Sequence, residues 1–457
     1  MRGRWVLAVI LALLLILGAG IGMVSAEVDK YAPGEVLVKF KGAHAAEDFV
    51  TLRGAHAESF AAGLPAQAQE ALSLVKARAI RAFPRIGVLQ VKLPGHLSVE
   101  EAIEKFKESG AVEFAEPNYE VQAAAKPEAT AQASETIPND PYFSKQWGLK
   151  NSNDADIDAP EAWNLECTDG TGVIVVVIDT GVDYNHPDLK TNLWINPWMG
   201  QFGYVNDLYG INAITDSGDP KDDNGHGTHC AGIIGAVGNN GSGVCGVAWK
   251  AQIMGLKFLN SAGSGYEADG MECINYALAV KQKYESQGQH PPMVMSNSWG
   301  GDPASNSMYL TLQEVMKQGV LFVAAAGNNG RNTDIFPFYP ACYGDARRYD
   351  LPNIISVGAS DNRDKKPYWS NYGANSVDLF APGNSIYSTL LNSSYGLKSG
   401  TSMACPHVSG AAALVWSYNL ASGYLAIKGK VSLVDPKTAF TGKCVTNGRL
   451  NLFNAIK

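Results

Sequence analysis

The stretch Val173-Ile-Val-Val-Val-Ile-Asp-Thr-Gly-Val-Asp183 decides the fold of this chain. Its first part (173–178) is a continuous β-branched run, which is typical of a strand buried on both faces of a parallel sheet. Similar apolar runs recur at 251–259, 293–297, 320–326 and 354–358. An amphipathic helical pattern covers 266–281, with apolar residues on one stripe. Alternation of strands and helices predicts an α/β domain with a doubly wound, mostly parallel sheet over residues 139–457.

Asp179 directly follows the deciding strand. In a doubly wound sheet, ligands bind in the crevice at the carboxyl ends of the strands. A carboxylate at that point can be partly buried and still reach the crevice. An alternative is that Asp179 only caps the turn before Gly181.

His226 lies in the segment Asn224-Gly-His-Gly-Thr-His-Cys-Ala-Gly232. Flanking glycines allow close backbone approach, and an imidazole at a helix start can act as a general base near neutral pH. The alternative is a zinc site made of His226, His229 and Cys230. The spacing disfavours zinc, because the chain has no H-E-x-x-H sequence and no C-x-x-C pair.

Ser402 lies in Ser399-Gly-Thr-Ser-Met-Ala-Cys-Pro-His407, where the following apolar residues predict the start of a helix. A lone serine there is more often an N-cap than a nucleophile. With Asp179 and His226 it makes the three parts of a catalytic triad. Asn328, after the buried strand at 320–326, could donate to an oxyanion together with the backbone N–H of Ser402. Its alternative role is that of an ordinary loop residue before Gly330.

The N-terminus has the pattern of an export signal. Arg2 and Arg4 precede an apolar run (5–24), and small residues flank a cleavage point after Ala26. We therefore expect a signal peptide at 1–26 and a secreted protein, extracellular or periplasmic, without membrane attachment after cleavage. An uncleaved membrane anchor is the alternative, because the run could just span a bilayer.

Residues 27–122 predict a small α+β domain. Segments 35–41 and 87–93 alternate apolar and polar residues, as half-buried strands do. Ser98 and Glu101 have the spacing of a capping box before a short amphipathic helix. Residues 123–138 have few large apolar side chains and predict a flexible linker that proteases can cut.

Composition narrows the classes of function. The net charge is −8 and the pI is about 5.6, which argues against a nucleic-acid binder. Charged residues make up 18% of the chain, too few for a highly charged disordered protein. The seven cysteines leave at least one unpaired in a monomer, and their pairing stays open.

Four segments together resemble the subtilisin-like serine proteases (subtilases), closest in motif to the thermitase and proteinase K branches. The segments are VVVIDTGVDYNHPDL (175–189), NGHGTHCAG (224–232), AAAGN (324–328) and SGTSMACPHVSG (399–410). The resemblance implies a secreted serine endopeptidase that acts on proteins and peptides, with Asp179, His226 and Ser402 as triad and Asn328 as oxyanion donor. It also implies that Cys230 is a buried free thiol. The rival is a non-catalytic peptide-binding protein of the same fold, which the presence of all four chemical residues disfavours. A lipase-type hydrolase is disfavoured too, because no G-x-S-x-G elbow occurs.

Further roles follow from the same resemblance. Substrate-binding positions are Ser298, Trp299, Gly300 and Gly327, and their lack of acidic groups favours broad or apolar specificity. Structural Ca²⁺ is implied at Asp140, Asp188 and Asn240, with no cofactor for the chemistry itself; three surface turn residues are the alternative. Four further aspartates could form a second, weaker site or a solvated acidic loop: Asp216, Asp219, Asp222 and Asp223.

Residues 27–122 resemble a subtilase propeptide in segments 33–41 and 111–121. The resemblance implies a self-processing zymogen, in which the propeptide assists folding and inhibits the site as an intramolecular partner. We expect the maturation cut within 123–138 and a monomeric mature enzyme. A permanently attached interaction domain is the alternative for residues 27–122.

Overall fold

The computed structural model describes residues 31–43, 50–123, 138–164 and 169–457. The expected signal peptide (1–26) and the linker from 124 to 137 lie outside the described residues. Residues from Tyr31 onward cluster into one unit, so contacts between its N-terminal and C-terminal sheets belong to a single body.

A nine-stranded sheet runs through the C-terminal part, in the order β17-β18-β14-β13-β12-β10-β6-β8-β7. Its strands, in chain order, are β6 (Ile174–Asp179), β7 (Gly210–Asn212), β8 (Gln252–Lys257), β10 (Met293–Asn297), β12 (Leu321–Ala325), β13 (Ile354–Ser360), β14 (Leu379–Pro382), β17 (Asp435–Pro436) and β18 (Gly448–Arg449). Neighbouring strands pair in parallel except at the β17–β18 edge. The predicted doubly wound, mostly parallel sheet is therefore confirmed.

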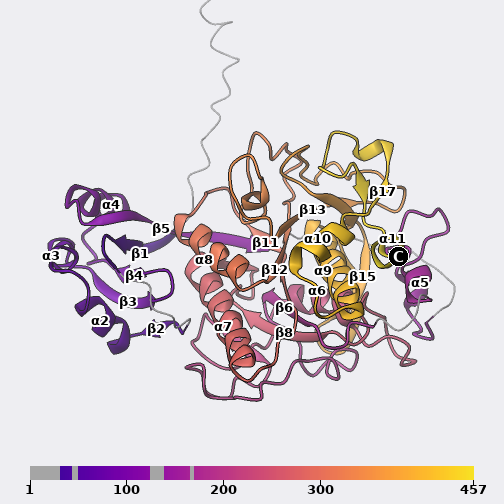
Figure 1. Ribbon diagram of the computed structural model, residues 1–457, viewed down its shortest axis with the longest axis horizontal. Helices are drawn as coiled ribbons and strands as arrows, with labels where there is room; N and C mark the ends of the chain where they lie inside the picture. The colour runs from indigo at the N-terminus through magenta and orange to yellow at the C-terminus, as the bar shows by residue number, and fades with distance from the viewer. Residues whose placement is uncertain (1–30, 44–49, 124–137, 165–168) are drawn as a thin grey trace, which may run out of the picture. The chain divides into compact units, whose positions relative to one another are not determined.

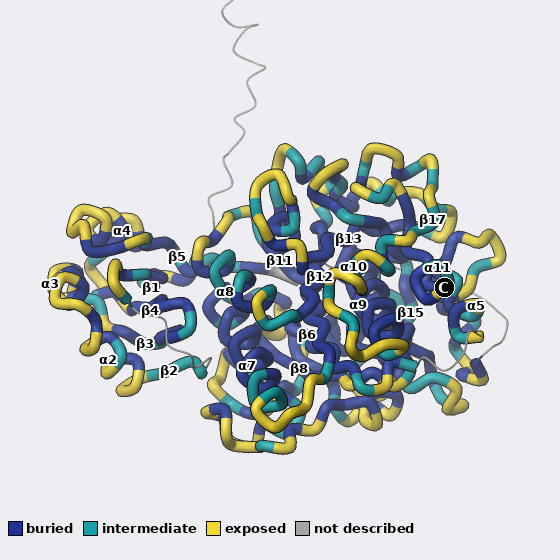
Figure 2. Tube along the Cα trace, viewed as in Figure 1, coloured by how far each residue is buried: buried dark blue, intermediate teal, exposed yellow. Residues whose placement is uncertain are grey.

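Helices cover both faces of this sheet (Figure 1). On one face, Val175 and Val177 of β6 join a core with α6 (His226–Gly235) and α9 (Thr401–Tyr418). On the other face, Val176 of β6 joins a core with α7 (Glu267–Ser286) and α8 (Asn306–Lys317). Every residue of β6 is buried, which explains its unbroken apolar sequence, and the buried interior follows the strands in Figure 2.

The N-terminal part is a second sheet with helices packed on it. Its elements are β1 (Tyr31–Phe40), β2 (Leu52–Arg53), α2 (Ala55–Ala62), α3 (Ala66–Val75), β3 (Arg78–Phe83), β4 (Val88–Lys92), α4 (Val99–Glu108) and β5 (Val112–Ala123). The capping box expected from Ser98 and Glu101 is present at the start of α4. This antiparallel arrangement fits the small α+β unit that the sequence predicts.

Shorter elements complete the chain. They are η1 (Phe143–Lys145), α5 (Ala159–Trp163), β9 (Ser264–Tyr266), β11 (Trp299–Gly300), η2 (Ala341–Gly344), β15 (Ile386–Leu390), β16 (Ser394–Lys398), α10 (Tyr424–Val431), η3 (Thr438–Phe440) and α11 (Leu452–Ile456). Strand β5 pairs with both β9 and β11, so it joins the two parts of the molecule. Ala123, which we expected in the linker, is the last residue of β5, because its backbone pairs with Trp299.

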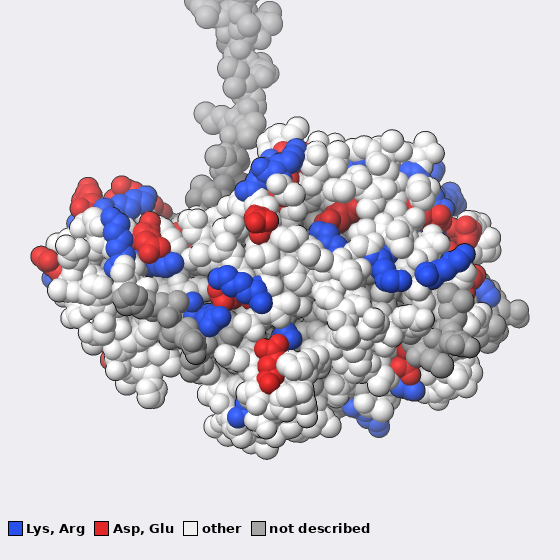
Figure 3. Space-filling model, in the orientation of Figure 1, with Lys and Arg blue, Asp and Glu red and all other residues white. Residues whose placement is uncertain are grey.

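The cysteines of the described residues are all free and buried: Cys230, Cys245, Cys273, Cys342, Cys405 and Cys444. Cys167 lies outside the described residues. Within the described ranges, no helix combines the length and apolarity needed to cross a bilayer. Basic and acidic side chains are interspersed on the face shown in Figure 3.

Candidate active site

Asp179 and His226 are in direct contact. Asp179 is the last residue of β6 and His226 the first of α6. The Nδ1 atom of His226 lies 2.7 Å from Oδ1 of Asp179, and each residue is 1% exposed. Gly227 permits this approach, because a Cβ there would lie 2.1 Å from the carbonyl oxygen of Gly181. The carboxylate therefore holds the imidazole in the tautomer that carries its proton on Nδ1.

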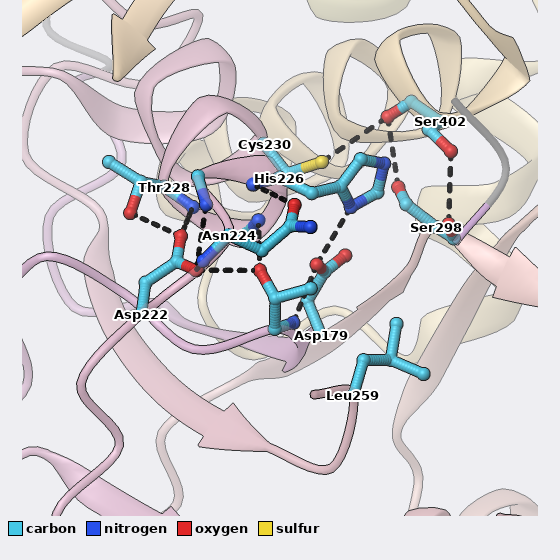
Figure 4. Close-up of polar contacts among 12 residues, drawn as sticks. Asp179, Asp222, Asn224, His226, Thr228, Cys230, Leu259, Ser298 and Ser402 are labelled. Atoms are coloured by element: carbon cyan, nitrogen blue, oxygen red, sulfur yellow. Dashed lines mark hydrogen bonds and ion pairs between the residues drawn. The ribbon is translucent and has the colours of Figure 1, made fainter. Parts of the chain in front are cut away.

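The second ring nitrogen of His226, Nε2, faces Ser402 (Figure 4). It is buried and has no hydrogen-bond partner among the described residues. Ser402 is the second residue of α9, and its Oγ donates to the carbonyl oxygen of Ser298 at 3.0 Å. The carbonyl oxygen of Ser402 in turn accepts from Oγ of Ser298 at 2.9 Å. The three predicted side chains thus come from β6, α6 and α9 and lie together beyond the carboxyl end of β6 (Figure 4).

Asp222 also belongs to this site, although the sequence analysis considered it only for a second metal site or an acidic loop. Its Oδ1 accepts from the hydroxyl of Thr180 at 2.8 Å and from the backbone N–H groups of Asn224 and Gly225 at 2.9 Å each. Its Oδ2 accepts from the backbone and hydroxyl of Thr228 at 2.9 and 2.6 Å. The buried carboxylate therefore ties the residue after Asp179 to the turn that carries His226 (Figure 4). The only local sign of this role is the position of Asp222 four residues before His226, in Asp222-Asp-Asn-Gly-His226.

Asn328 is held by its amide oxygen. That oxygen accepts from the backbone N–H of Thr401 at 2.9 Å and from its hydroxyl at 3.1 Å. Thr401 donates both hydrogen bonds, so the amide oxygen of Asn328 must be the atom that faces Thr401. The amide NH₂ group then points elsewhere and can donate to an anion. Ser402 lies in the first turn of α9, where backbone N–H groups have no acceptor within the helix and the dipole favours negative charge.

Strand β5 lies between β9 and β11, beside this site. Strand β5 pairs antiparallel with β11, with Gln122 opposite Gly300 and Ala123 opposite Trp299. On its other edge it pairs antiparallel with β9, with Val121 opposite Gly265. The predicted substrate-binding positions Ser298 to Gly300 therefore line an edge that accepts an extended backbone.

Gly300 and Gly327, two of the expected substrate-binding positions, both lie against the Phe338 ring, from which a Cβ would be 2.4 and 2.9 Å away. Gly327 has a φ of 96°, and a Cβ there would lie 2.6 Å from Nδ2 of Asn371, so only glycine fits. Trp299 is fully buried, and its ring packs edge-to-face on Phe258 with centroids 4.9 Å apart. Trp299 thus contributes its backbone to the edge while its ring joins the core.

Glu116 and Asn118 of β5 cap two helices of the C-terminal part. The Glu116 carboxylate accepts from the backbone N–H groups of Asn306 and Ser307, at 2.9 and 2.8 Å. The side-chain oxygen of Asn118 accepts from the backbone N–H of Ala268 at 3.0 Å. Both contacts satisfy N–H groups that the first turns of α8 and α7 leave without acceptors. No local pattern indicates these two caps, because each partner is more than a hundred residues away.

The predicted metal ligands lie together. Asp140 is 2% exposed and Asp188 is 0% exposed. Asn240 donates its side-chain N–H to Oδ1 of Asp188 at 3.0 Å and its backbone N–H to Oδ1 of Asp140 at 3.3 Å. Burial raises the pKa of Asp140, and the charge of Asp188 adds to the rise. Two buried carboxylates without a basic side chain paired to them in the described structure fit a hard divalent cation. The side-chain oxygen of Asn240 accepts from the backbone N–H of Ser242 at 2.7 Å, so the carboxylates of Asp140 and Asp188 are the main candidate ligands.

The zinc alternative is not supported by the geometry. His229 points its Nε2 to the carbonyl oxygen of Gly396, at 3.1 Å, and burial lowers its pKa to about 3. The group that could hold a metal within the described ranges is Asp179, His226 and Cys230, with ligand atoms within 4.8 Å of one another. There the Asp179 oxygen already binds the imidazole, and burial raises the pKa of the Cys230 thiol, which disfavours the thiolate a metal needs. The expected burial of free Cys230 is confirmed.

The four aspartates of the acidic loop take separate partners. Asp219 accepts from the hydroxyl of Tyr184 at 3.0 Å, and Asp223 pairs with Lys257 at 2.7 Å. Asp222 belongs to the network of the His226 turn, and Asp216 pairs with arginines of the N-terminal part. In the described structure these four carboxylates therefore have separate partners and do not share one.

Comparison with known proteins gives a consistent result. The subtilase family profile matches residues 170–428, and that of the fervidolysin N-terminal prodomain matches residues 21–118. Thermitase of Thermoactinomyces vulgaris is 36% identical over 321 residues, which cover 70% of this chain and 99% of thermitase. The thermophilic serine proteinase of Bacillus sp. (strain AK1) is 33% identical over 439 residues, which cover 95% of this chain and 90% of that protein. Subtilisin-like protease 2 of Plasmodium falciparum is 34% identical over 269 residues, 58% of this chain and 18% of that protein.

Proposed function

Because the chain belongs to the subtilase family and is a serine endopeptidase with an N-terminal prodomain, we propose that Asp179, His226 and Ser402 are its catalytic triad. The observation that carries this assignment is the 2.7 Å contact between Asp179 and the Nδ1 atom of His226, with the opposite ring nitrogen facing Ser402. This is the arrangement in which a base is oriented by one group and serves another.

The reaction then has two acyl-transfer steps. The Ser402 Oγ attacks the carbonyl carbon of the scissile bond, and His226 Nε2 takes the hydroxyl proton. As the C–N bond breaks, His226 returns that proton to the leaving amine. Water attacks the acyl ester in the same way, giving the carboxylic acid and the original serine. Asp179 keeps Nδ1 protonated throughout and stabilises the imidazolium.

Asn328 supplies the oxyanion stabilisation in this proposal. The two contacts with Thr401 hold its amide oxygen away from the reacting carbonyl. The amide NH₂ group and the backbone N–H of Ser402 then donate to the oxygen that becomes negative. The contacts with Thr401 fix the Asn328 side chain before reaction, which supports its role as a preorganised donor.

Protein and peptide substrates bind as extended strands at Ser298, Trp299 and Gly300, with Gly327 in the adjoining pocket. The position of β5 supports this, because it already pairs with β11 and β9 at that edge. The lack of acidic side chains in these segments favours broad or apolar specificity over cleavage at basic residues.

The prodomain acts as an intramolecular inhibitor and folding partner in this proposal. Strand β5 occupies the edge at which a substrate would pair, which supports inhibition until the chain is cut. The caps from Glu116 and Asn118 support a role in ordering α8 and α7, since a parallel sheet assembles slowly. The maturation cut at 123–138 falls mostly outside the described residues.

Structural calcium would be held by Asp140, Asp188 and Asn240. When bound, the cation would neutralise two buried carboxylates and so stabilise the loop after α6, without a part in the chemistry. We also propose export by the signal at 1–26 and a monomeric mature enzyme, extracellular or periplasmic.

A fluorophosphonate probe tests the assignment directly. The mature protein should be labelled, and Ser402→Ala should be neither labelled nor able to process itself, while it retains the wild-type thermal midpoint. Labelling of Ser402→Ala, or continued self-cleavage, would remove Ser402 from its role. If the protein were a non-catalytic peptide-binding protein, the probe would label neither the wild type nor Ser402→Ala.

A further inference from the structure

Arg81 of β3 reaches out of the prodomain into a cluster of acidic groups of the protease domain. Its Nη1 lies 2.6 Å from Oδ1 of Asp269, and its Nε lies 3.1 Å from Oε2 of Glu272. Its Nη2 donates to the carbonyl oxygen of Ala213 at 3.2 Å and lies 3.5 Å from Oδ1 of Asp216. Every nitrogen of this guanidinium group therefore faces an oxygen of the other domain.

Arg53 of β2 enters the same cluster from the neighbouring strand. Its Nε lies 2.9 Å from Oδ1 of Asp216, and its Nη2 contacts Oε1 of Glu272 and the hydroxyl of Tyr204. The guanidinium carbon also lies 4.7 Å from the centre of the Tyr204 ring. A planar cation over an aromatic face, with carboxylates at its edge, is an environment that suits arginine better than lysine.

Glu272 lies at the centre of this cluster on α7. Its side chain is 1% exposed, and burial raises the pKa of its carboxyl group. A buried carboxylate is costly unless a cation pairs with it. In the described structure, the ion pairs of Glu272, Asp269 and Asp216 are all made with Arg53 and Arg81. The protease domain thus supplies three acidic groups and leaves their neutralisation to the prodomain.

Arg85 is a third prodomain arginine that pairs with the protease domain, but its partner Glu314 has a second cation. Arg85 pairs with Glu314 of α8 at 2.7 Å. Glu314 also pairs with Lys317 of its own helix at 2.6 Å, so it keeps a cation when the prodomain leaves. Glu272 has no such substitute within the described part of its own domain.

We propose that Glu272, Asp269, Asp216 and Tyr204 form a guanidinium-binding site outside the catalytic cleft, which retains the cleaved prodomain through Arg53 and Arg81 and binds arginine-bearing peptides once vacated. The inference rests on the proposed function, because only a self-cleaving protease releases its prodomain. Strand β5 blocks the cleft through backbone pairing that any sequence can make, whereas this site selects a side chain. Release of the inhibitor, and so the onset of activity, is set by how tightly the two arginines are held.

The rate of prodomain release tests the site without use of the chain's own activity. A Ser402→Ala chain with a recognition sequence for an unrelated site-specific protease inserted in the linker is immobilised through a C-terminal tag and cut. Loss of the prodomain fragment into buffer is then followed. The double variant Arg53→Gln/Arg81→Gln should release the fragment at least about 30-fold faster, because the loss of both guanidinium groups leaves the buried Glu272 carboxylate unpaired in the complex.

The matched control is Arg78→Gln on the same strand, since Arg78 is exposed and pairs within the prodomain with Glu58. It should release the fragment at the wild-type rate. Equal rates for the double variant and Arg78→Gln would overturn the proposal. Arg81→Lys, which keeps the charge and loses the planar fork, should lie between wild type and the double variant.

A competition experiment needs no variant of the arginines, so it decides the matter if the double variant fails to fold. Arginine amide added to the cut Ser402→Ala complex should accelerate release several-fold more than lysine amide at equal ionic strength. Equal effects of the two amides would overturn the guanidinium site. If the wild-type chain failed to hydrolyse casein while release still depended on arginine, the proposed function would fall and the binding site would stand.

Discussion

Replacement of Asp222 by asparagine should destabilise the protease domain and slow the reaction. In the least costly orientation, the new amide oxygen takes the place of Oδ1 and keeps its three donors, Thr180, Asn224 and Gly225. The amide NH₂ group then faces the backbone N–H of Thr228, which loses its acceptor. Losing a hydrogen bond to a charged group costs about 1.5–3 kcal/mol, and losing a negative charge at a helix start about 0.3–1 kcal/mol. We expect the free energy of unfolding to fall by about 2–4 kcal/mol.

Urea unfolding measures this change, in a Ser402→Ala background so that the protein cannot digest itself. Asp223→Asn is the control, because its carboxylate is 52% exposed and its buried partner Lys257 also donates to the carbonyl oxygens of Thr180 and Leu259. The new amide oxygen can still accept from Lys257, so the loss should be about 1 kcal/mol, smaller than for Asp222→Asn. A loss no larger for Asp222→Asn than for Asp223→Asn would refute the reasoning.

The same substitution in the active enzyme should lower kcat by about 10- to 100-fold with little change in KM. The reason is that Asp222 fixes the turn from which His226 projects, and a shift of about 1 Å in a reacting group can cost about 100-fold. Steady-state kinetics on a peptide anilide checks this. An unchanged kcat would show that the turn keeps its position without the carboxylate.

Three further outcomes are expected. Asn328→Ala should lower kcat about 100- to 1,000-fold at nearly constant KM, the magnitude known for such a donor in this same family, and an unchanged kcat would exclude it from the oxyanion site. Chelation of calcium should lower the Tm of the mature form, because a cation at about 100 times its Kd adds about 2.7 kcal/mol; Asp188→Asn should abolish that calcium dependence, and a Tm that ignores calcium would refute the ligand set. Burial lowers the pKa of His407 from 6.5 to about 4. Between about pH 6.5 and pH 4 the ring is neutral in the native state and charged in the unfolded state. The free energy of unfolding should therefore fall by about 3 kcal/mol as the pH drops from about 6.5 to about 4. An NMR titration of the His407 ring checks this, and a midpoint above about pH 5 would contradict it.

Much of the fold and of the site could be predicted because the signals are local. The unbroken run before Asp179 predicts a strand buried on both faces, and the structure has β6 there. His226 begins a helix and Ser402 lies in the first turn of another, as the apolar residues after them indicate. Each of these features depends on neighbours within about ten residues, which a sequence displays directly.

Other features depend on segments far apart in the chain. The pattern over 266–281 predicts one apolar stripe, whereas α7 is buried on nearly all sides from Glu267 to Lys281. Residues of the protease domain such as Phe202 and Tyr204 pack against this helix, and Arg81 of the prodomain pairs with Asp269 and Glu272 on it. Asp222 was indistinguishable from its acidic neighbours, because nothing local shows that its carboxylate turns toward Thr180 and Thr228.

The sequence by itself determined the parallel α/β architecture, the chemical groups of the site and the presence of a separate N-terminal domain, because periodicity and motif spacing are properties of contiguous residues. Only the tertiary structure decided which carboxylate holds the turn that carries His226 and which ones pair with the arginines of the prodomain. Those roles are set by burial and by partners in distant segments, and burial determines whether a charged group is solvated, paired or costly.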